Sequence, residues 1–317
     1  MNKTAIIMDC DPGQDDAIAL MLAAANLDKV DFLGVTTLAG NQTGDLTSRN
    51  ALRVLTLIGA TKIPVARGCD APMLRKLRTA PEIHGKSGLD GAAHPEPGFP
   101  LDRRHAIDFL IETIMAQESV VLVPTGPLTN VGLAFLREPR IKDHIERIVL
   151  MGGAMDNCNT TPAAEFNIYV DPEAARIVFK SGLPITIVVL DATHKAFFSP
   201  DDVAALWALN GRISSLIAHL LSFYIGSYRA VFGINGAPLH DPLAMAEAIH
   251  PGICRTHHWF VDIETQGELT TGETVVDRYG VTDKKPNCDV ALNLDLPRFK
   301  TMIFDAFKKL DAGPAQA

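Results

Sequence analysis

Four aspartates within eight residues near the N-terminus are the part of this sequence most able to do chemistry. They lie in the stretch Asp9-Cys10-Asp11-Pro12-Gly13-Gln14-Asp15-Asp16. Carboxylates held this close together repel one another and raise each other's pKa unless a cation lies among them. Ligands that are all oxygen favour a hard ion, Ca²⁺ or Mg²⁺. The alternative is an ordinary corner between a strand and a helix, but a helix cap needs only one acidic residue.

The flanking residues predict how this cluster is positioned. Residues 5–8 form a short apolar run closed by Pro-Gly, which is typical of a buried strand. Residues 17–25 predict a helix whose first turn carries Asp15 and Asp16, where negative charge suits the positive end of the helix dipole. On an extended segment Asp9 and Asp11 point to the same side, towards the start of that helix.

Strand and helix patterns alternate through the first two thirds of the chain. Further strands are predicted at residues 31–38, 64–66, 120–123, 148–151 and 184–190, and further helices at residues 45–58 and 172–181. These repeats predict an open, Rossmann-like α/β fold, with a mostly parallel central sheet and helices on both faces. A helix at 213–232, a small antiparallel addition at 259–292 and a closing helix at 297–310 follow. Ligands of such sheets bind beyond the carboxyl ends of the strands.

Most of the other polar motifs follow such strand ends. Thr125 begins a Thr-Gly-Pro turn, and Asn159, Glu165 and Asn167 follow the strand at 148–151. These side chains offer the donors and acceptors that hydroxyl-rich ligands need, although Asn-rich loops are also commonly plain turns. His240 and Asp241 precede Pro242. Asp241 is therefore predicted to lie outside a helix and to cap the next one.

Residues 68–102 interrupt the alternating pattern. They are rich in Pro and Gly, and they contain His84 within Ile83-His84-Gly85-Lys86-Ser87-Gly88. A long segment without periodicity is usually a functional loop or is disordered. We expect a lid that brings His84 to the site, with an ordinary surface loop as the alternative.

Composition excludes several classes of partner. The net charge of −8 argues against nucleic acid and against an anionic membrane surface. No stretch has the apolar length of a membrane span, and residues 5–8 are too short for a signal peptide. The five cysteines are odd in number and lack CxxC spacing, which predicts neither disulfides nor a zinc site. We expect a soluble protein of a reducing compartment.

The motifs together resemble one family of enzymes. Residues 9–17 resemble the signature of the inosine-uridine-preferring nucleoside hydrolases, and residues 164–175 resemble the second long motif of that family. His84-Gly85, Thr125-Gly126-Pro127 and His240-Asp241 occur in the family's order. The resemblance implies hydrolysis of the N-glycosidic bond of ribonucleosides to ribose and free base, with a Ca²⁺ cofactor.

The resemblance also implies roles for individual residues. One Ca²⁺ per chain would be held by Asp11, Asp16, the Thr125 carbonyl and Asp241, with Asp9 either supporting these ligands from behind or making a weak contact with the ion. Asp11 would act as the general base on a water whose pKa the ion lowers. The implied groups on the leaving-base side are His240 and Tyr228. The implied substrate contacts are Asp15, Asn41, His84, Met151, Asn159, Glu165, Phe166, Asn167 and Tyr224.

Base specificity depends on the helix predicted at 213–232. Tyr224 and Tyr228 are one turn apart and share a face, as in family members that accept purines and pyrimidines alike. We therefore expect activity on inosine and uridine both. The alternative is a pyrimidine-specific enzyme for uridine and cytidine, because much of the remaining sequence resembles the pyrimidine-preferring bacterial branch. Aromatic residues at this spacing are also typical of a packed core.

Two other function classes share features with this sequence. A haloacid-dehalogenase-type phosphohydrolase also begins with Asp-x-Asp after a strand, but it has Thr or Val where Gly13 stands here. A noncatalytic Ca²⁺-dependent nucleoside-binding module would keep the same ligands. No GxxxxGK[ST] or GxGxxG motif occurs. We expect a single domain over residues 1–312, a disordered tail at 313–317, and a cytoplasmic homodimer or homotetramer.

Overall fold

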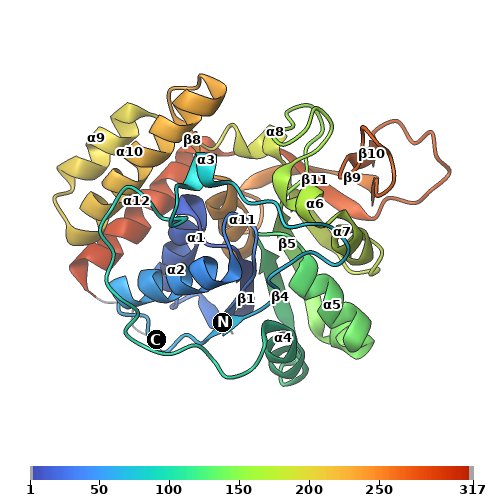
Figure 1. The fold of residues 1–317 in the computed structure, drawn as a ribbon, viewed down its shortest axis with the longest axis horizontal. Coiled ribbons are helices and arrows are strands. Elements are labelled where there is room, and N and C mark those ends of the chain that lie inside the picture. The colour runs from blue at the N-terminus through green and yellow to red at the C-terminus, as the bar shows by residue number, and fades with distance from the viewer. Residues whose placement is uncertain (1–2, 314–317) are drawn as a thin grey trace.

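A nine-stranded sheet forms the centre of the computed structural model, which describes residues 3–313 (Figure 1). Residues 314–317 of the predicted tail lie outside the described residues. The strand order is β10-β9-β11-β6-β5-β4-β1-β2-β3. The strands are β1 (Thr4–Cys10), β2 (Val30–Thr37), β3 (Val65–Arg67), β4 (Val120–Pro124), β5 (Ile145–Met151), β6 (Ile185–Val188), β9 (Cys254–Ile263), β10 (Thr274–Asp277) and β11 (Cys288–Leu294).

The sheet is mostly parallel, as the sequence predicted. All neighbours from β11 across to β3 run parallel, whereas β9 pairs antiparallel with both β11 and β10. The predicted antiparallel addition is therefore confirmed, and it extends the main sheet. A separate two-stranded sheet joins β7 (Phe197–Phe198) to β8 (Ala237–Pro238).

Helices cover both faces of the sheet (Figure 1). They are α1 (Gln14–Ala25), α2 (Gly44–Leu57), α3 (Pro81–His84), α4 (Ala106–Met115), α5 (Thr129–Arg137), α6 (Phe166–Val170), α7 (Pro172–Phe179), α8 (Leu190–Thr193), α9 (Pro200–Ala208), α10 (Arg212–Phe232), α11 (His240–Ile249) and α12 (Leu296–Ala312), with a 3₁₀ helix at Pro139–His144. Successive side chains along β1 point to opposite faces of the sheet, and they pack into two apolar cores, one on each face.

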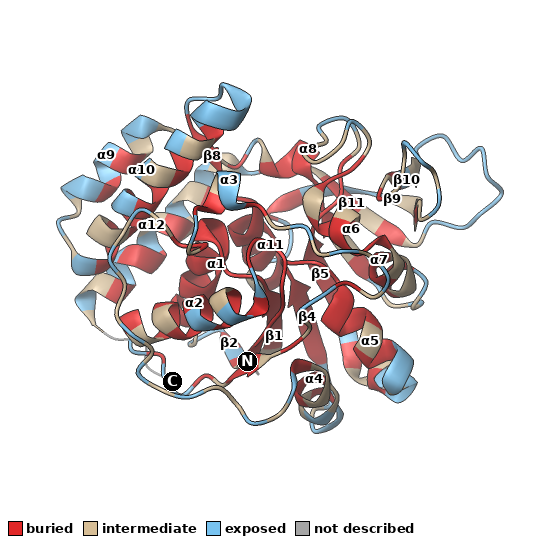
Figure 2. Cartoon of the chain, viewed as in Figure 1, coloured by how far each residue is buried: buried red, intermediate tan, exposed pale blue. Residues whose placement is uncertain are grey.

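The two cores hold the strand ends in place. Ile6 and Met8 pack in a core that includes α1, α10, α11 and α12, whereas Ile7 packs with residues of α4, α5 and α7. Figure 2 shows the central strands and α1 as buried almost throughout. Every residue of α1 is buried, including the polar residues of its first turn. The first turn of α1 is thus placed at the carboxyl end of β1 with little freedom to move.

Three local predictions differ from the structure. The strand predicted at 184–190 ends at Val188, and Leu190 begins the single turn α8. The segment 68–102 contains the single turn α3, which ends at His84. The prediction for Asp241 is wrong, because His240 and Asp241 are the first two residues of α11. Pro242 is tolerated there because the first turn of a helix leaves its N–H groups unpaired in any case.

Candidate active site

A pocket opens at the carboxyl ends of the parallel strands. It collects polar residues that the sequence singled out from many separate segments. Those that line it are Asp15, Asn41, His84, Thr125, Met151, Asn159, Glu165, Phe166, Asn167, Tyr224, Tyr228, His240 and Asp241. Asp11 and Asp16 lie beneath the surface of the pocket, fully buried, and they make hydrogen bonds to Asn41 and Thr125. The structure therefore brings all the predicted site residues together.

Four buried carboxylates make up a group that we call the carboxylate end: Asp15 and Asp241, which line the pocket, and Asp11 and Asp16 beneath them. One oxygen from each of Asp15, Asp16 and Asp241 lies within 4.8 Å of the other two. Burial, with repulsion from Asp16, raises the pKa of Asp15 to about 7, and burial raises the pKa of Asp16 to about 6. The pKa values of Asp11 and Asp241 are raised well above the usual range for the same reasons. Such a cluster is costly to ionise without a cation.

The chemistry of the carboxylate end fits a hard cation. Oδ1 of Asp11 and Oδ1 of Asp15 are buried and have no hydrogen-bond partner among the described residues. Buried polar atoms are normally hydrogen-bonded, so unpaired acceptors of this kind are expected where an ion is bound. The compact group differs from the predicted ligand set in containing Asp15 in addition to Asp16 and Asp241. Asp11 lies outside the compact group.

Hydrogen bonds hold Asp11 and Asp16, the two carboxylates that lie beneath the pocket surface. Asp16 accepts from the Gly13 backbone at 3.0 Å and from the Thr125 hydroxyl at 2.8 Å. Asp11 accepts from the Asn41 backbone at 2.6 Å. The residues Gly40 and Gly126 leave no room for a Cβ, because that atom would overlap the Asp11 carboxylate. The unpaired Oδ1 of Asp11 is thus held in place by the neighbours of its carboxylate.

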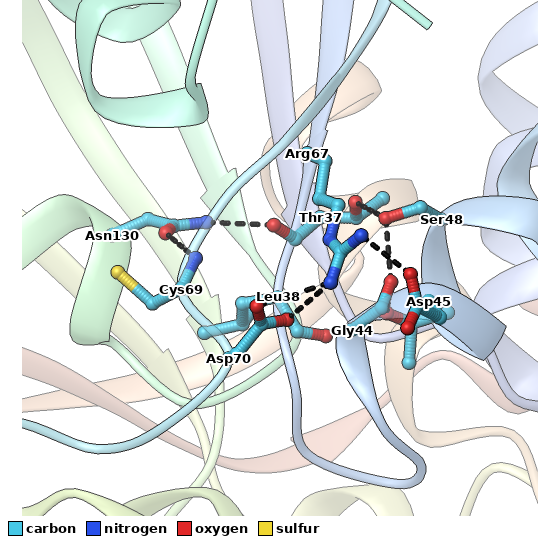
Figure 3. A network of polar contacts seen from close by, with 10 residues as sticks. Thr37, Leu38, Gly44, Asp45, Ser48, Arg67, Cys69, Asp70 and Asn130 are labelled. Carbon is cyan, nitrogen blue, oxygen red and sulfur yellow. Dashed lines mark hydrogen bonds and ion pairs between the residues drawn. The ribbon is translucent and has the colours of Figure 1, made fainter.

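Asp9 lies behind this cluster, and it does not line the pocket. Its Oδ1 accepts from the Thr36 hydroxyl at 2.6 Å and from the Asn130 amide at 2.8 Å. Asn130 also donates to the Thr37 carbonyl and accepts from the Cys69 backbone (Figure 3). Asp9 therefore joins the ends of three segments beneath the pocket, while its Oδ2 is buried without a hydrogen-bond partner within residues 3–313. Its supporting role stays a prediction.

Glu165 and Asn167 form one wall of the pocket through side chains that are anchored to backbone. Asn167 donates to the Thr125 carbonyl at 2.7 Å, and Glu165 accepts from the backbone N–H groups of Gly153, Asn167 and Ile168. Asn159 accepts from the Phe166 backbone at 3.0 Å. These contacts leave polar atoms facing the pocket in fixed positions, which suits the recognition of several hydroxyl groups.

A second group of side chains, which we call the aromatic end, consists of His84, Tyr224, Tyr228 and His240, which line the pocket, and of Thr193, which contacts His240. The Tyr228 hydroxyl lies 2.6 Å from Nε2 of His240, and the Thr193 hydroxyl lies 2.6 Å from Nδ1. The Tyr224 ring stacks on His84 and meets Tyr228 edge-on. Burial lowers the pKa of His240 well below its usual value and lowers that of His84 to about 3, so both rings are neutral.

Both tyrosines are buried and also line the pocket. They therefore belong to the packed core, and their contact with a base stays a prediction. The sequence reasoning missed Thr193, because nothing in a short apolar strand end marks a hydroxyl as a partner of a distant histidine. It also missed the contact between Gln14 and His84. The only sequence feature that pointed to a role for Gln14 was its position inside the acidic motif.

The comparison with protein families agrees with this geometry. Residues 6–301 match the model of the inosine-uridine preferring nucleoside hydrolases. The chain belongs to this family, and it is a hydrolase that acts on N-glycosyl bonds. The resemblance stated from the sequence motifs is thereby confirmed.

Two ribonucleoside hydrolases are similar in sequence to this protein over nearly its whole length. A pyrimidine-specific ribonucleoside hydrolase RihA from Shewanella baltica (strain OS155) is 49% identical over 308 residues, which cover 96% of both proteins. The RihA of Escherichia coli O127:H6 (strain E2348/69) is 46% identical over 305 residues, covering 96% of this chain and 98% of that protein.

Solved structures share the fold. A purine-preferring ribonucleoside hydrolase from Gardnerella vaginalis superposes with a TM-score of 0.90 at 31% identity, covering 97% of this chain and 99% of that one. The plant nucleoside hydrolase PpNRh1 also superposes with a TM-score of 0.90, at 30% identity. Within residues 3–313, no helix combines the length and apolar character needed to cross a bilayer.

Proposed function

We propose that this protein hydrolyses pyrimidine ribonucleosides to ribose and free base, with one Ca²⁺ held at the carboxylate end. The observation that carries the proposal is that buried carboxylate oxygens of Asp11 and Asp15 have no hydrogen-bond partner within residues 3–313 and lie beside Asp16 and Asp241. An all-oxygen ligand set favours Ca²⁺ over transition metals. When bound, the ion neutralises these carboxylates and lowers the pKa of a water beside Asp11.

Side chains of the protein supply the general base and the contacts with the ribose. Asp11 takes the proton of the attacking water as a general base. Asp15, Asn41 and Asn167 hold the ribose hydroxyls, and binding energy away from the reacting carbon helps to reach an oxocarbenium-like transition state. Asn159 and Glu165, beside the pocket wall, hold the 5′-hydroxyl.

At the aromatic end, Tyr224 packs against the base while Tyr228 and His240 deliver a proton to it. Their contact of 2.6 Å supports a shared proton path, since each group can both donate and accept. The proton reaches the departing base as its bond to the ribose carbon breaks.

Pyrimidines are the proposed substrate class because the RihA relatives are named pyrimidine-specific and are 46–49% identical over nearly their full length. A broader enzyme, active on inosine as well, is the second candidate. It is favoured by Tyr224 and Tyr228, which line the pocket and stack with other rings there. A phenol can pack against any base, so the tyrosine pair does not by itself exclude purines.

A substrate panel of uridine, cytidine, inosine and adenosine tests the proposal. We expect hydrolysis of uridine and cytidine with values of kcat/KM well above those for both purine nucleosides. Comparable turnover of inosine would establish the broader candidate instead. No release of ribose from any of the four would overturn the proposed substrate class, and binding without turnover would indicate a noncatalytic module.

We also propose a cytoplasmic homodimer or homotetramer. The five free cysteines are consistent with a reducing compartment. Tyr279 and Val281 are 89% and 82% exposed, and they offer apolar surface for subunit contact. Sedimentation at micromolar protein concentration should give a dimer or tetramer, and a strict monomer would refute this assembly.

A further inference from the structure

The side chain of Gln14 joins the acidic motif to His84 through hydrogen bonds. Gln14 is the first residue of α1 and is fully buried, and His84 is the last residue of α3 and lines the pocket. The Gln14 amide nitrogen lies 3.2 Å from the His84 carbonyl and 3.1 Å from the Asp90 carbonyl. Its amide oxygen lies 2.8 Å from Nδ1 of His84.

These three contacts determine which way the Gln14 amide is oriented. Carbonyl oxygens only accept hydrogen bonds, so the –NH₂ group must be the end that faces His84 O and Asp90 O. The opposite orientation would place two pairs of acceptors against each other inside a buried site. The oxygen therefore faces the imidazole, and since this oxygen can only accept, Nδ1 of His84 must carry a hydrogen.

The imidazole of His84 is neutral and therefore carries only one hydrogen on its two nitrogens. Burial lowers the pKa of His84 to about 3, so at neutral pH the ring carries a single N–H. With that hydrogen on Nδ1, Nε2 is a bare acceptor. Within residues 3–313, Nε2 has no hydrogen-bond partner in the protein, while the ring lines the pocket and stacks on Tyr224.

The surrounding backbone holds the imidazole in this position. A Cβ on Gly13 would overlap the His84 ring, so glycine at this point of the motif allows the ring to lie against α1. Gly85 has a positive φ of 78°, and its carbonyl accepts from the Gln42 amide at 2.9 Å. The turn after His84 is therefore anchored twice, by Gln42 through Gly85 and by Gln14 through His84 and Asp90.

We propose that Gln14 is a positioning residue for base recognition, which holds His84 in the Nδ1–H tautomer so that Nε2 accepts a hydrogen bond from an N–H group of the base. This inference rests on the proposed function for the placement of the base. Uracil has one such donor, N3–H, and cytosine has one, its amino group. Because neutral His84 has no hydrogen on Nε2, the proton for the departing base comes from the side of His240 and Tyr228.

The tautomer is measured directly, without substrate, by ¹⁵N NMR of protein labelled at histidine, with His84→Asn used to assign the signals. We expect Nδ1 of His84 to be protonated and Nε2 to be unprotonated at neutral pH. In Gln14→Met the hydrogen on Nδ1 loses its acceptor, and we expect the tautomer signature to change. Gln42→Met is the matched control, since Gln42 holds the same turn through the Gly85 carbonyl and, within residues 3–313, makes no hydrogen bond to the imidazole. It should leave the parent signature unchanged.

Hydrolysis rates then test whether the enzyme recognises the N–H donor of the base. We expect the parent to prefer uridine to 3-methyluridine, and cytidine to N4,N4-dimethylcytidine, by about tenfold or more. Gln14→Met should narrow both preferences by about tenfold, whereas Gln42→Met should keep them. A hydrogen on Nε2 in the parent would overturn the proposal, as would preferences that Gln14→Met leaves intact. A parent without activity on pyrimidine nucleosides would refute the proposed function while leaving the tautomer result standing.

Discussion

The carboxylate end and the aromatic end of the pocket are built in different ways. Three of the four acids at the carboxylate end come from one turn between β1 and α1, and hydrogen bonds to backbone hold Asp11 and Asp16. The five residues of the aromatic end come from three helices that are distant in the chain, α3, α8 and α10, and from the start of α11. The carboxylate end is therefore a local structure, whereas the aromatic end depends on how helices pack together.

The two ends also differ in what their burial does. At the carboxylate end, burial raises the pKa values of acids that remain partly unpaired, and this favours binding of a cation. At the aromatic end, burial lowers the pKa values of His84 and His240, and hydrogen bonds to Gln14, Thr193 and Tyr228 orient the neutral rings. We infer that the first end binds the ion and ribose, and that the second recognises and protonates the base.

The largest effect is expected from Asp11→Asn. This change keeps the shape of the side chain but removes the general base, so kcat should fall by about 10²–10⁴ while the fold is retained. The measurement is the initial rate of ribose release from uridine. Asp70→Asn is the control, because Asp70 is an exposed partner of Arg67 outside the pocket (Figure 3). A parental rate in Asp11→Asn would exclude this role.

A smaller effect is expected from Tyr228→Phe. The variant loses the hydroxyl that lies 2.6 Å from Nε2 of His240, and kcat should fall by about ten- to a hundredfold. The loss should be much smaller for a riboside whose leaving group is stable without a proton, such as p-nitrophenolate. Tyr224→Phe removes a neighbouring phenol hydroxyl at the same end. Equal losses in both variants, on both kinds of substrate, would indicate packing and would argue against proton delivery.

The stability of the cation-free protein should depend on pH in a particular direction. Asp15 and Asp16 have pKa values of about 7 and about 6 in the fold, against 3.8 without these surroundings. The folded protein thus keeps protons that the unfolded chain releases, and its stability should fall as pH rises from about 4 to about 7, where these groups lose their protons in the fold as well. Added Ca²⁺ should restore more stability at about pH 8 than at about pH 5.

Thermal unfolding with chelator or with excess Ca²⁺, across this pH range, checks that expectation. The difference in Tm between the two conditions should grow with pH. A difference that is constant, or that shrinks towards high pH, would show that the ion does not replace protons at these carboxylates.

The contrast between the two ends also explains what the sequence could predict. The carboxylate motif, the parallel strands and the helix at 213–232 follow local patterns, and the structure agrees with each of them. The helical position of Asp241 was missed because the preference of a residue before proline was weighed without the tolerance of a helix start. Thr193 and the contact between Gln14 and His84 depend on packing between segments that are distant in the chain, which no local pattern reports.

The central claim is that one ion at the carboxylate end is required for hydrolysis. The direct measurement is a Ca²⁺ titration of chelator-stripped protein, followed in parallel by calorimetry and by ribose release from uridine. We predict binding of one ion per chain, with activity rising in proportion to the bound ion and reaching its plateau at that stoichiometry. Asp16→Ala should abolish both signals. Full activity in the stripped protein, or Ca²⁺ binding that leaves the rate unchanged, would contradict the account.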